Sequence, residues 1–316
     1  MKKTNTLCAL MLSLVMSFGS VVADAQNLKF GKPSKEEWDF KAWDETPDAE
    51  AVVLCKTLKT QYHLRGESRV YDADMPNLSA QSRFDNTFGM GIGPGNTTMT
   101  YEVKLRTKIL KDSGAGYANV DIVYFDDKDK KDDHDEFYSL KVMTFEMVNG
   151  KVKRKLVSNA TFKDERIADR YKVRHIVVPD VKAGMIVEYQ YTLFSSRYAF
   201  LYDWQLEEKI PVVYTRCDME IPAFLNFDMK VPISSAVKRS VKAGTVTVEH
   251  QTIDLQAPKL CRTNIYLIES EKILPFAEST SGVKKEMANI HAKLKNKIDV
   301  PLEPLPAGKR HIMLNP

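Results

Sequence analysis

The sequence lacks the short motifs that mark the common metal and nucleophilic sites. It contains no H-E-x-x-H, no G-x-S-x-G and no paired C-x-x-C, and its six histidines are scattered. These motifs place zinc ligands or an activated serine in a fixed geometry, so their absence argues against the enzyme classes that use them. We therefore expect no catalytic residue, no metal site and no cofactor.

Neither sign of charge is in clear excess. The chain has 46 basic and 42 acidic side chains, well mixed, and a formal net charge of +4. Nucleic-acid binding usually requires a concentrated basic surface. We expect no nucleic-acid partner.

Long hydrophobic runs are confined to the N-terminus. Lys2 and Lys3 precede an apolar run over residues 7–22, which ends in the small-residue triplet at 23–25. This pattern predicts a secretory signal peptide over residues 1–25, cleaved before Gln26. Cys8 lies at the start of the run, where it cannot serve as a lipid anchor, and no later stretch approaches the roughly 20 apolar residues of a membrane helix. We expect a soluble, periplasmic protein without a transmembrane segment.

Cysteine is scarce in the mature chain. Cys55, Cys217 and Cys261 remain after cleavage, an odd number with no close pair. One disulfide and one thiol are compatible with an oxidising compartment, but the sequence leaves the pairing open.

Most of the mature chain has the pattern of short β-strands. Runs rich in Val, Ile, Tyr, Phe and Thr alternate with polar turns, and V-N-G-K at 148–151 is typical of a hairpin turn. The absence of β-α-β alternation favours an all-β fold, which we predict to be a large antiparallel β-sandwich over residues 26–270. The runs are AVVLCKT, TTMTYEVKLRTKIL, ANVDIVYF, EFYSLKVMTFEMV, KVRHIVV, MIVEYQYTL, PVVYTRCDMEI and GTVTVEHQTIDL.

Two helices are expected outside these strands. Ser34, followed three residues later by Glu37, predicts a capping box and a short N-terminal helix. Val283, Met287 and Leu294 recur at helical spacing, which predicts a C-terminal helix over 283–296 within a final segment of helix and tail, residues 271–316.

An aromatic stretch over residues 188–204 poses the choice between a core and a ligand platform. From Met185, the odd positions share one face of a strand, and after a turn at 194–197 the even positions from Tyr198 to Trp204 share a face of a return strand. We predict a hairpin whose rings pack in the core. Tyr198, Asp203 and Trp204, toward the end of the stretch, are the candidate ligand contacts. The rings are Tyr189, Tyr191, Phe194, Tyr198, Phe200, Tyr202 and Trp204.

Several spaced elements of this region resemble an exported bacterial family. They are the K-x-G-x-x-x-E-Y-x-Y strand (Lys182, Gly184, Glu188, Tyr189, Tyr191), Asp203-Trp204, the I-P-V at 210–212 and the I-P at 221–222. The family shares a β-rich domain of unknown function that usually precedes a transglutaminase-like, cysteine-protease-related domain. The resemblance covers roughly residues 28–255 and implies a large β-sandwich. It implies no reaction, because the domain itself has no established chemistry. The residues after Leu255 are too few to hold the catalytic domain that usually follows.

A transglutaminase-like triad inside the sandwich is not expected. Cys217, His250 and Asp254 occur in the order that such enzymes use, but each falls in a strand pattern. An activated thiolate of this type normally lies at a helix N-terminus, where the dipole lowers its pKa.

Two unusual loops also receive structural interpretations. The glycine-rich run at 89–95 is followed by no Gly-Lys-Ser/Thr and leads into a strand pattern, so it is not expected to hold phosphate. The acidic run at 126–136 lacks the D-x-D-x-D-G spacing of a calcium loop and contains lysines, so we expect a solvated hairpin tip.

These observations predict a non-catalytic, exported module that binds or scaffolds an envelope protein or a glycan. The alternative is an accessory subunit, or a remnant, of a transglutaminase-like enzyme whose catalytic chain is separate.

Overall fold

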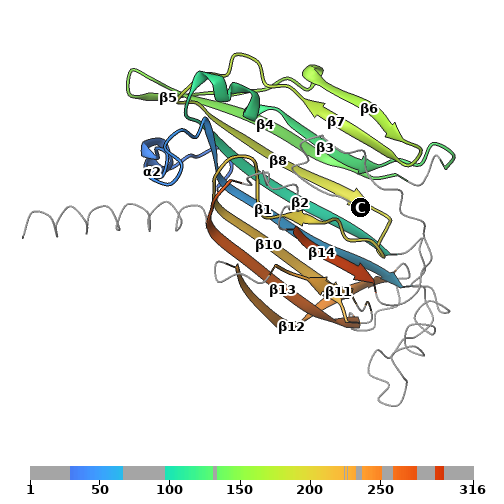
Figure 1. The fold of residues 1–316 in the computed structure, drawn as a ribbon. Helices are drawn as coiled ribbons and strands as arrows, with labels where there is room; N and C mark the ends of the chain where they lie inside the picture. Colours follow the sequence, from blue (N-terminus) through green and yellow to red (C-terminus); the bar gives the residue numbers. More distant parts are fainter. Residues whose placement is uncertain are drawn as a thin grey trace, which may run out of the picture.

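β-Strands dominate the described part of the chain, as the computed structural model shows (Figure 1). The structure describes residues 29–66, 97–130, 134–223, 225, 227–232, 237–250, 259–275 and 289–294. Its helical elements are short: α2 (Lys35–Asp39) and the 3-10 turns η1 (Asp112–Ala118) and η2 (Asn159–Thr161). The prediction of an all-β chain is confirmed.

One eight-stranded sheet forms the main layer. Its order is β10–β13–β12–β1–β2–β8–β4–β5, and β10 also pairs with β1. The bounds are β1 Ala51–Gly66, β2 Thr97–Ile109, β4 Glu136–Val148, β5 Lys151–Leu156, β8 Ile186–Ser195, β10 Val212–Pro222, β12 Val237–His250 and β13 Lys259–Ile273.

The sheet is mixed rather than purely antiparallel, which corrects the prediction. β1 runs parallel to β10, from Val53 beside Val212 to Gln61 beside Glu220, and its last residues run parallel to the end of β12. Hairpin reasoning identifies antiparallel neighbours only. A parallel pair needs a long connection, and here the chain from β2 to β9 lies between β1 and β10.

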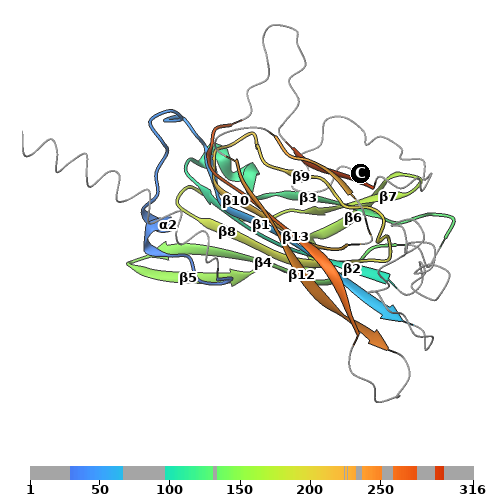
Figure 2. The same cartoon turned by 90° about the horizontal axis from the view of Figure 1, so that it is seen from below.

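Two three-stranded sheets cover one face of the large sheet (Figures 1 and 2). The first is β3–β7–β6, with bounds Val120–Phe125, Tyr171–Ile176 and Phe162–Ala168. The second is β11–β14–β9, with bounds Phe227–Lys230, Asn289–Leu294 and Trp204–Gln205. Apolar side chains from all three sheets form one continuous core.

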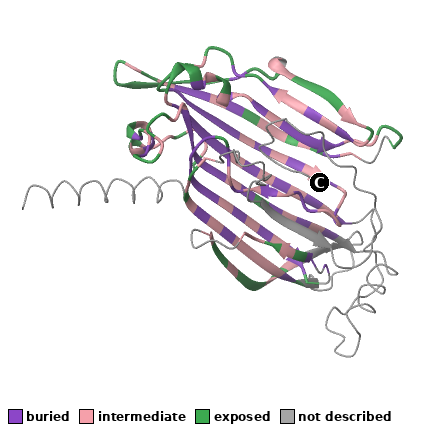
Figure 3. Cartoon of the chain, in the orientation of Figure 1, coloured by how far each residue is buried: buried purple, intermediate pink, exposed green. Residues whose placement is uncertain are grey.

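The N-terminal segment covers the opposite face of the large sheet. Phe40 and Trp43 pack there on Val52, Leu54 and Ile186 in a second apolar cluster. Where only one face of the large sheet is covered, buried and half-buried residues alternate along the strands (Figure 3). In β2 this alternation gives way to an unbroken buried run over residues 105–109, where the sheet has both faces covered.

Local sequence signals are reproduced at α2 and at the β4–β5 turn. The Ser34 hydroxyl accepts from the Glu37 N–H (3.2 Å), and the Glu37 carboxylate accepts from the Ser34 N–H (2.7 Å), which forms the expected capping box. Asn149 and Gly150 both have positive φ (51° and 73°), as a two-residue type I′ hairpin turn requires.

Five of the seven rings in the aromatic stretch are core, but the predicted hairpin is wrong. Along β8 the odd positions are buried as expected, and Tyr189 and Tyr191 are each 1% exposed. After Ser195, however, the chain leaves the sheet, and Trp204 lies in β9, which pairs with β14. Tyr198, Tyr202 and Trp204 still meet the rings of β8 in the core, because β9 lies in the layer that covers the large sheet. Phe194 and Phe200 are only half-buried.

The predicted C-terminal helix is wrong where the structure describes it. Asn289–Leu294 form the strand β14, which pairs with β11 and β9. Helical periodicity is a weak signal in a short segment, because an isolated helix of that length is marginal and pairing with available strands prevails. β13 also continues past residue 270 to Ile273. Within the described residues, no helix has the length and apolar character required to cross a bilayer.

Candidate binding pocket

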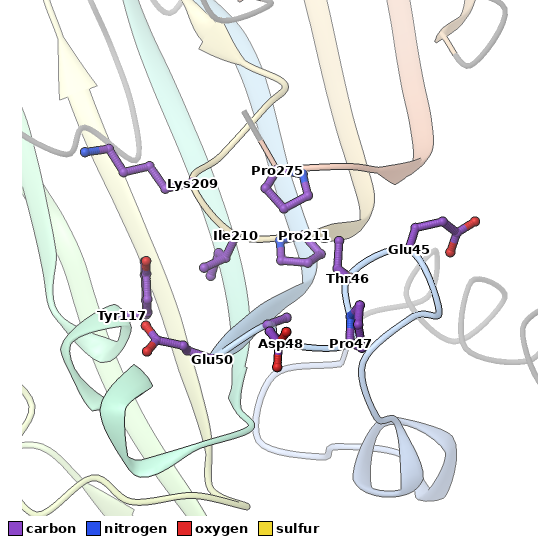
Figure 4. Close-up of a pocket in the computed structure, with 11 residues that line it drawn as sticks. Glu45, Thr46, Pro47, Asp48, Glu50, Tyr117, Lys209, Ile210, Pro211 and Pro275 are labelled. Carbon is purple, nitrogen blue, oxygen red and sulfur yellow. The ribbon is translucent and has the colours of Figure 1, made fainter. Parts of the chain in front are cut away.

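A pocket of about 400 Å³ lies at the end of the large sheet where β1 and β10 begin (Figure 4). The loop after α2 forms one side, the approach to β10 and the residues after β13 form the other, and η1 supplies an aromatic ring. The lining residues are Glu45, Thr46, Pro47, Asp48, Ala49, Glu50, Tyr117, Lys209, Ile210, Pro211 and Pro275.

Backbone hydrogen bonds hold the pocket walls in place. The Glu50 carbonyl accepts from the N–H groups of Leu110 (2.8 Å) and Lys111 (3.0 Å), and the Pro211 carbonyl accepts from Val53 N–H (2.9 Å). Gly114 lies so close to Glu50 that an added Cβ would be 2.2 Å from the Glu50 carbonyl oxygen. Because β1 and β10 are parallel, both walls start at the same end of the sheet. The pocket is therefore preformed.

The lining combines apolar and acidic groups. Pro47, Ile210, Pro211 and Pro275 present apolar surface, whereas three carboxylates and the Lys209 ammonium lie around them. The lining contains no cysteine, histidine or serine. This chemistry suits binding of a chain with apolar and basic groups, and it offers no activated nucleophile.

Two of the three carboxylates form ion pairs of different exposure. Glu45 forms an ion pair with Lys272 (2.6 Å), and this hydrogen bond holds the pKa of Glu45 below its ordinary value. Asp48 is 99% exposed and lies 3.3 Å from the Lys111 ammonium. An exposed ion pair of this kind contributes little free energy. Asp48 therefore remains accessible to a basic group from outside.

The residues proposed from the sequence as ligand contacts lie elsewhere. Trp204 is 1% exposed, and its indole N–H donates to the Thr215 hydroxyl (2.9 Å). Tyr198 is 7% exposed, and Asp203 is half-buried. None of the three lines the pocket, and the two rings belong to the main core.

A buried lysine accompanies Trp204. The Lys56 side chain is fully buried, its ammonium lies 2.6 Å from Glu208, and it stands 5.2 Å from the Trp204 ring centroid. Burial of this ion pair is tolerable only because each charge has a partner. Trp204 is thus enclosed by the core and by a cation, and its ring faces are not open to a sugar.

A second buried charge cluster joins the N-terminal segment to the large sheet. The Arg106 guanidinium on β2 donates to Glu37 of α2 (2.5 and 2.7 Å) and to Glu188 of β8 (2.6 Å). It also donates to the carbonyl of Lys29 (2.8 Å), and Glu188 accepts from the N–H of Gly31 (2.7 Å). All three charged side chains are at most 2% exposed.

The sequence gives no sign of this cluster, because charged side chains usually lie on the solvent-exposed surface. Glu188 lies on the face of β8 opposite the buried odd positions, and the N-terminal segment covers that second face too. Burial raises the pKa of Glu188, and Arg106 opposes the rise. Lys108 lies beside the cluster and donates to backbone carbonyls at the C-terminal end of α2, those of Trp38 and Phe40 (2.8 Å for Phe40). Burial lowers the pKa of Lys108 to about 8.

Asp135 is a buried carboxylate at the start of β4. It accepts hydrogen bonds from the Phe125 N–H (3.0 Å) and from the Tyr202 hydroxyl. Burial raises the pKa of Asp135, with hydrogen bonds from Ser195 and Tyr202 opposing the rise. The residue ties the covering sheet to the main one.

The acidic run joins β3 and β4, which belong to different sheets, but an antiparallel bridge between Asp126 and His134 closes the run as a hairpin does, and residues 128–130 are exposed. Asp126 is held by Arg166 and by Lys172 (2.7 Å), and Lys128 pairs with Asp169 (2.7 Å). In the described residues, no three His, Cys, Asp or Glu side chains gather as metal ligands do. The glycine-rich run at 89–95 lies outside the described residues.

The thiols are placed as structural residues. Cys55 and Cys217 are fully buried thiols, and burial raises the pKa of each. Such a pKa disfavours the thiolate that nucleophilic catalysis needs. The side chain of Cys261 lies outside the described residues, so the pairing expectation stays open for it.

The Cys217–His250 arrangement does not assemble. Cys217 lies beside Leu58 of β1, whereas the backbone of His250 lies beside Gly66, eight residues further along the same strand. That separation is about 26 Å at strand spacing, far beyond hydrogen-bond reach. Asp254 lies outside the described residues.

Comparisons with curated proteins and with solved structures find a distant structural neighbour. No curated protein is similar enough to count as a relative. A crystal structure of a "putative protease" from Parabacteroides distasonis matches 77% of this chain at 13% identity, with a TM-score of 0.44. The chain spans 39% of that protein's length.

A family model matches residues 95–259, which run from the start of β2 through β12 to the first residue of β13. The matched region is a little more than half of the chain, and its description is "Domain of Unknown Function with solved-structure structure". The chain belongs to this family, DUF3857.

Proposed function

We propose that the chain is a non-catalytic β-sandwich module, exported to the cell envelope, that binds an extended segment of a partner protein in the pocket. The observation that carries the proposal is the pocket itself: a preformed hollow of about 400 Å³ with a proline-rich wall, accessible carboxylates and no nucleophile–base pair. Export follows from the N-terminal signal pattern.

A protein fits the pocket better than a glycan does. Sugar sites usually stack the ring of the ligand on exposed aromatic faces, and the lining supplies only one ring, Tyr117. The aromatic residues first considered for a glycan, Tyr198 and Trp204, are buried. Proline and isoleucine surfaces beside Asp48 and Glu50 instead suit an extended chain that carries a basic side chain.

The enzyme-linked alternative is a variant of the same binding role. An accessory subunit of a transglutaminase-like or cysteine-protease-related enzyme would use the pocket to hold its catalytic chain. The identity of the bound protein separates the two forms of the proposal.

Photo-crosslinking tests the pocket directly. A photoreactive phenylalanine analogue replaces the exposed Lys209 on the pocket rim, and a control protein carries it at the exposed Lys163 on β6. We expect irradiation of cells to give a discrete adduct from position 209 and none from position 163.

A charge exchange makes the test specific. Asp48→Lys should abolish the adduct, whereas Asp129→Lys, at an exposed position in another loop, should leave it unchanged. Equal adducts from both crosslinker positions, or an adduct that is indifferent to Asp48→Lys, would contradict the pocket assignment.

A further inference from the structure

The edge strand β5 differs from the other strands of the large sheet. All six of its residues, K-V-K-R-K-L, are exposed. Among the described residues it pairs only with β4, which leaves its other edge open. It lies at one end of the sheet order (Figure 1), and none of its residues lines the pocket.

The register identifies which backbone groups face outward. The two-residue turn makes Val148 and Lys151 the closing hydrogen-bonded pair, so Lys151, Lys153 and Lys155 direct their N–H and C=O groups toward β4. The backbone groups of Val152, Arg154 and Leu156 therefore point to the open edge. These groups form a row of hydrogen-bond donors and acceptors along β5, whose six residues span about 20 Å.

Charge on this edge is strongly positive. Lys151, Lys153, Arg154 and Lys155 occupy four of the six positions. Lys155 is 3.7 Å from the exposed Asp180, and the neighbouring Glu146 carboxylate is already held by Lys182 at 2.6 Å. The cations are therefore only weakly neutralised by their own chain.

Apolar side chains accompany the charge. Val152 (48% exposed) and Leu156 (62%) lie on one face of β5, and Met147 (44%), directly opposite Val152 on β4, extends the strip. The N-terminal segment covers this same face one strand further in, on β4, where Phe145 and Met143 belong to its apolar cluster.

We propose that β5 is a docking edge for an extended acidic segment of a partner protein, which would add to the sheet as a further strand. Lysines on an edge strand disfavour pairing between identical strands. Two paired copies of β5 would bring four cations of one strand next to four of the other, and these would repel each other. They have the opposite effect on an acidic strand, whose carboxylates would complement them while its backbone bonds to the outward groups. The apolar strip would receive alternate side chains of that strand. The proposal does not depend on the pocket.

The test uses a fluorescein-labelled peptide of alternating Glu and Val as the probe, read by anisotropy with the mature protein. Lys153→Glu with Lys155→Glu should weaken binding by about tenfold or more. The matched control, Arg239→Glu with Lys242→Glu, makes the same charge change on exposed positions of β12 and should stay within about twofold.

Val152→Pro separates strand addition from simple charge attraction. It removes one outward N–H and keeps every cation, and proline is tolerated where an edge N–H faces solvent. We expect it to weaken peptide binding by about fivefold or more. A peptide N-methylated at alternate residues should lose binding to the unmodified protein, which repeats the test without altering the fold.

Three results would overturn the proposal. One is undiminished binding of the peptide to Val152→Pro together with undiminished binding of the N-methylated peptide. Another is an equal loss in the β12 control. The third is binding of phosphatidylglycerol vesicles with no binding of the peptide, which would make β5 a membrane-contact strand.

Discussion

Replacing Arg106 by methionine tests the buried cluster that joins α2 to the sheet. The side chain keeps its length and much of its apolar volume but loses its charge. Glu37 and Glu188, both buried, then face each other without the cation that lies 2.5–2.7 Å from them. Removing one partner of a buried pair costs about 3–5 kcal/mol of unfolding free energy, and two stranded carboxylates place the expectation near 5.

Such a loss is large against the total. Domains are stable by about 5–15 kcal/mol, and a loss of 3–5 kcal/mol lowers the melting temperature of a chain this size by roughly 6–20 °C. Arg216→Met is the matched control, since Arg216 is 34% exposed and pairs with the partly exposed Asp218 (27%, 2.7 Å). A surface pair of this kind contributes about 0–1 kcal/mol. Urea unfolding followed by tryptophan fluorescence measures both variants.

The pH dependence provides a second readout. Burial already raises the pKa of Glu188 against the opposing effect of Arg106, so removing Arg106 raises it further. A carboxyl whose pKa is higher in the folded state than in the unfolded state destabilises the fold at neutral pH. This destabilisation disappears as the pH falls toward the unfolded pKa of about 4.3. Arg106→Met should therefore recover part of its stability between pH 7 and pH 5. A variant within 1 kcal/mol of the parent at pH 7, or one without this recovery, would refute the reasoning.

Three further results are expected. Tyr191→Ala, at a ring 1% exposed, should cost about 3–5 kcal/mol in a urea melt, whereas Tyr138→Ala, at a ring 86% exposed, should cost under about 0.5; overlaid melts of Tyr191→Ala and the parent would exclude the core assignment. Because burial raises the pKa of Asp135, the parent should lose stability relative to Asp135→Asn as the pH rises from about 4, and a constant difference from pH 4 to 7 would contradict this. Mass spectrometry of the exported protein should find Gln26 at the N-terminus, and an acylated N-terminus or an intact Met1 would oppose the signal-peptide assignment.

Local signals in the sequence were sufficient for some elements. The capping box at Ser34 and Glu37, the Asn149–Gly150 turn and the buried odd positions of β8 each depend on residues within a few positions of one another. Backbone propensity and strand alternation act at that range, so the sequence alone could predict these features.

Features that depend on distant partners could not be read in this way. Arg106 and Glu188 resemble solvent-facing charges until the N-terminal segment covers that face of the sheet. The sequence of β14 has a helical pattern, but the segment forms a strand that pairs with β11 and β9. The pocket joins residues 45–50, 117, 209–211 and 275, which become neighbours only when β1 and β10 pair in parallel. No local pattern encodes that pairing.

The most direct test of the central claim is turnover by the purified mature protein. The protein and its Cys217→Ala variant are assayed side by side for peptide hydrolysis and transamidation. Since Cys217 is buried on a strand and about 26 Å along the sheet from His250, the account predicts no turnover, or a trace that the substitution leaves unchanged. A robust activity that Cys217→Ala abolishes would contradict it.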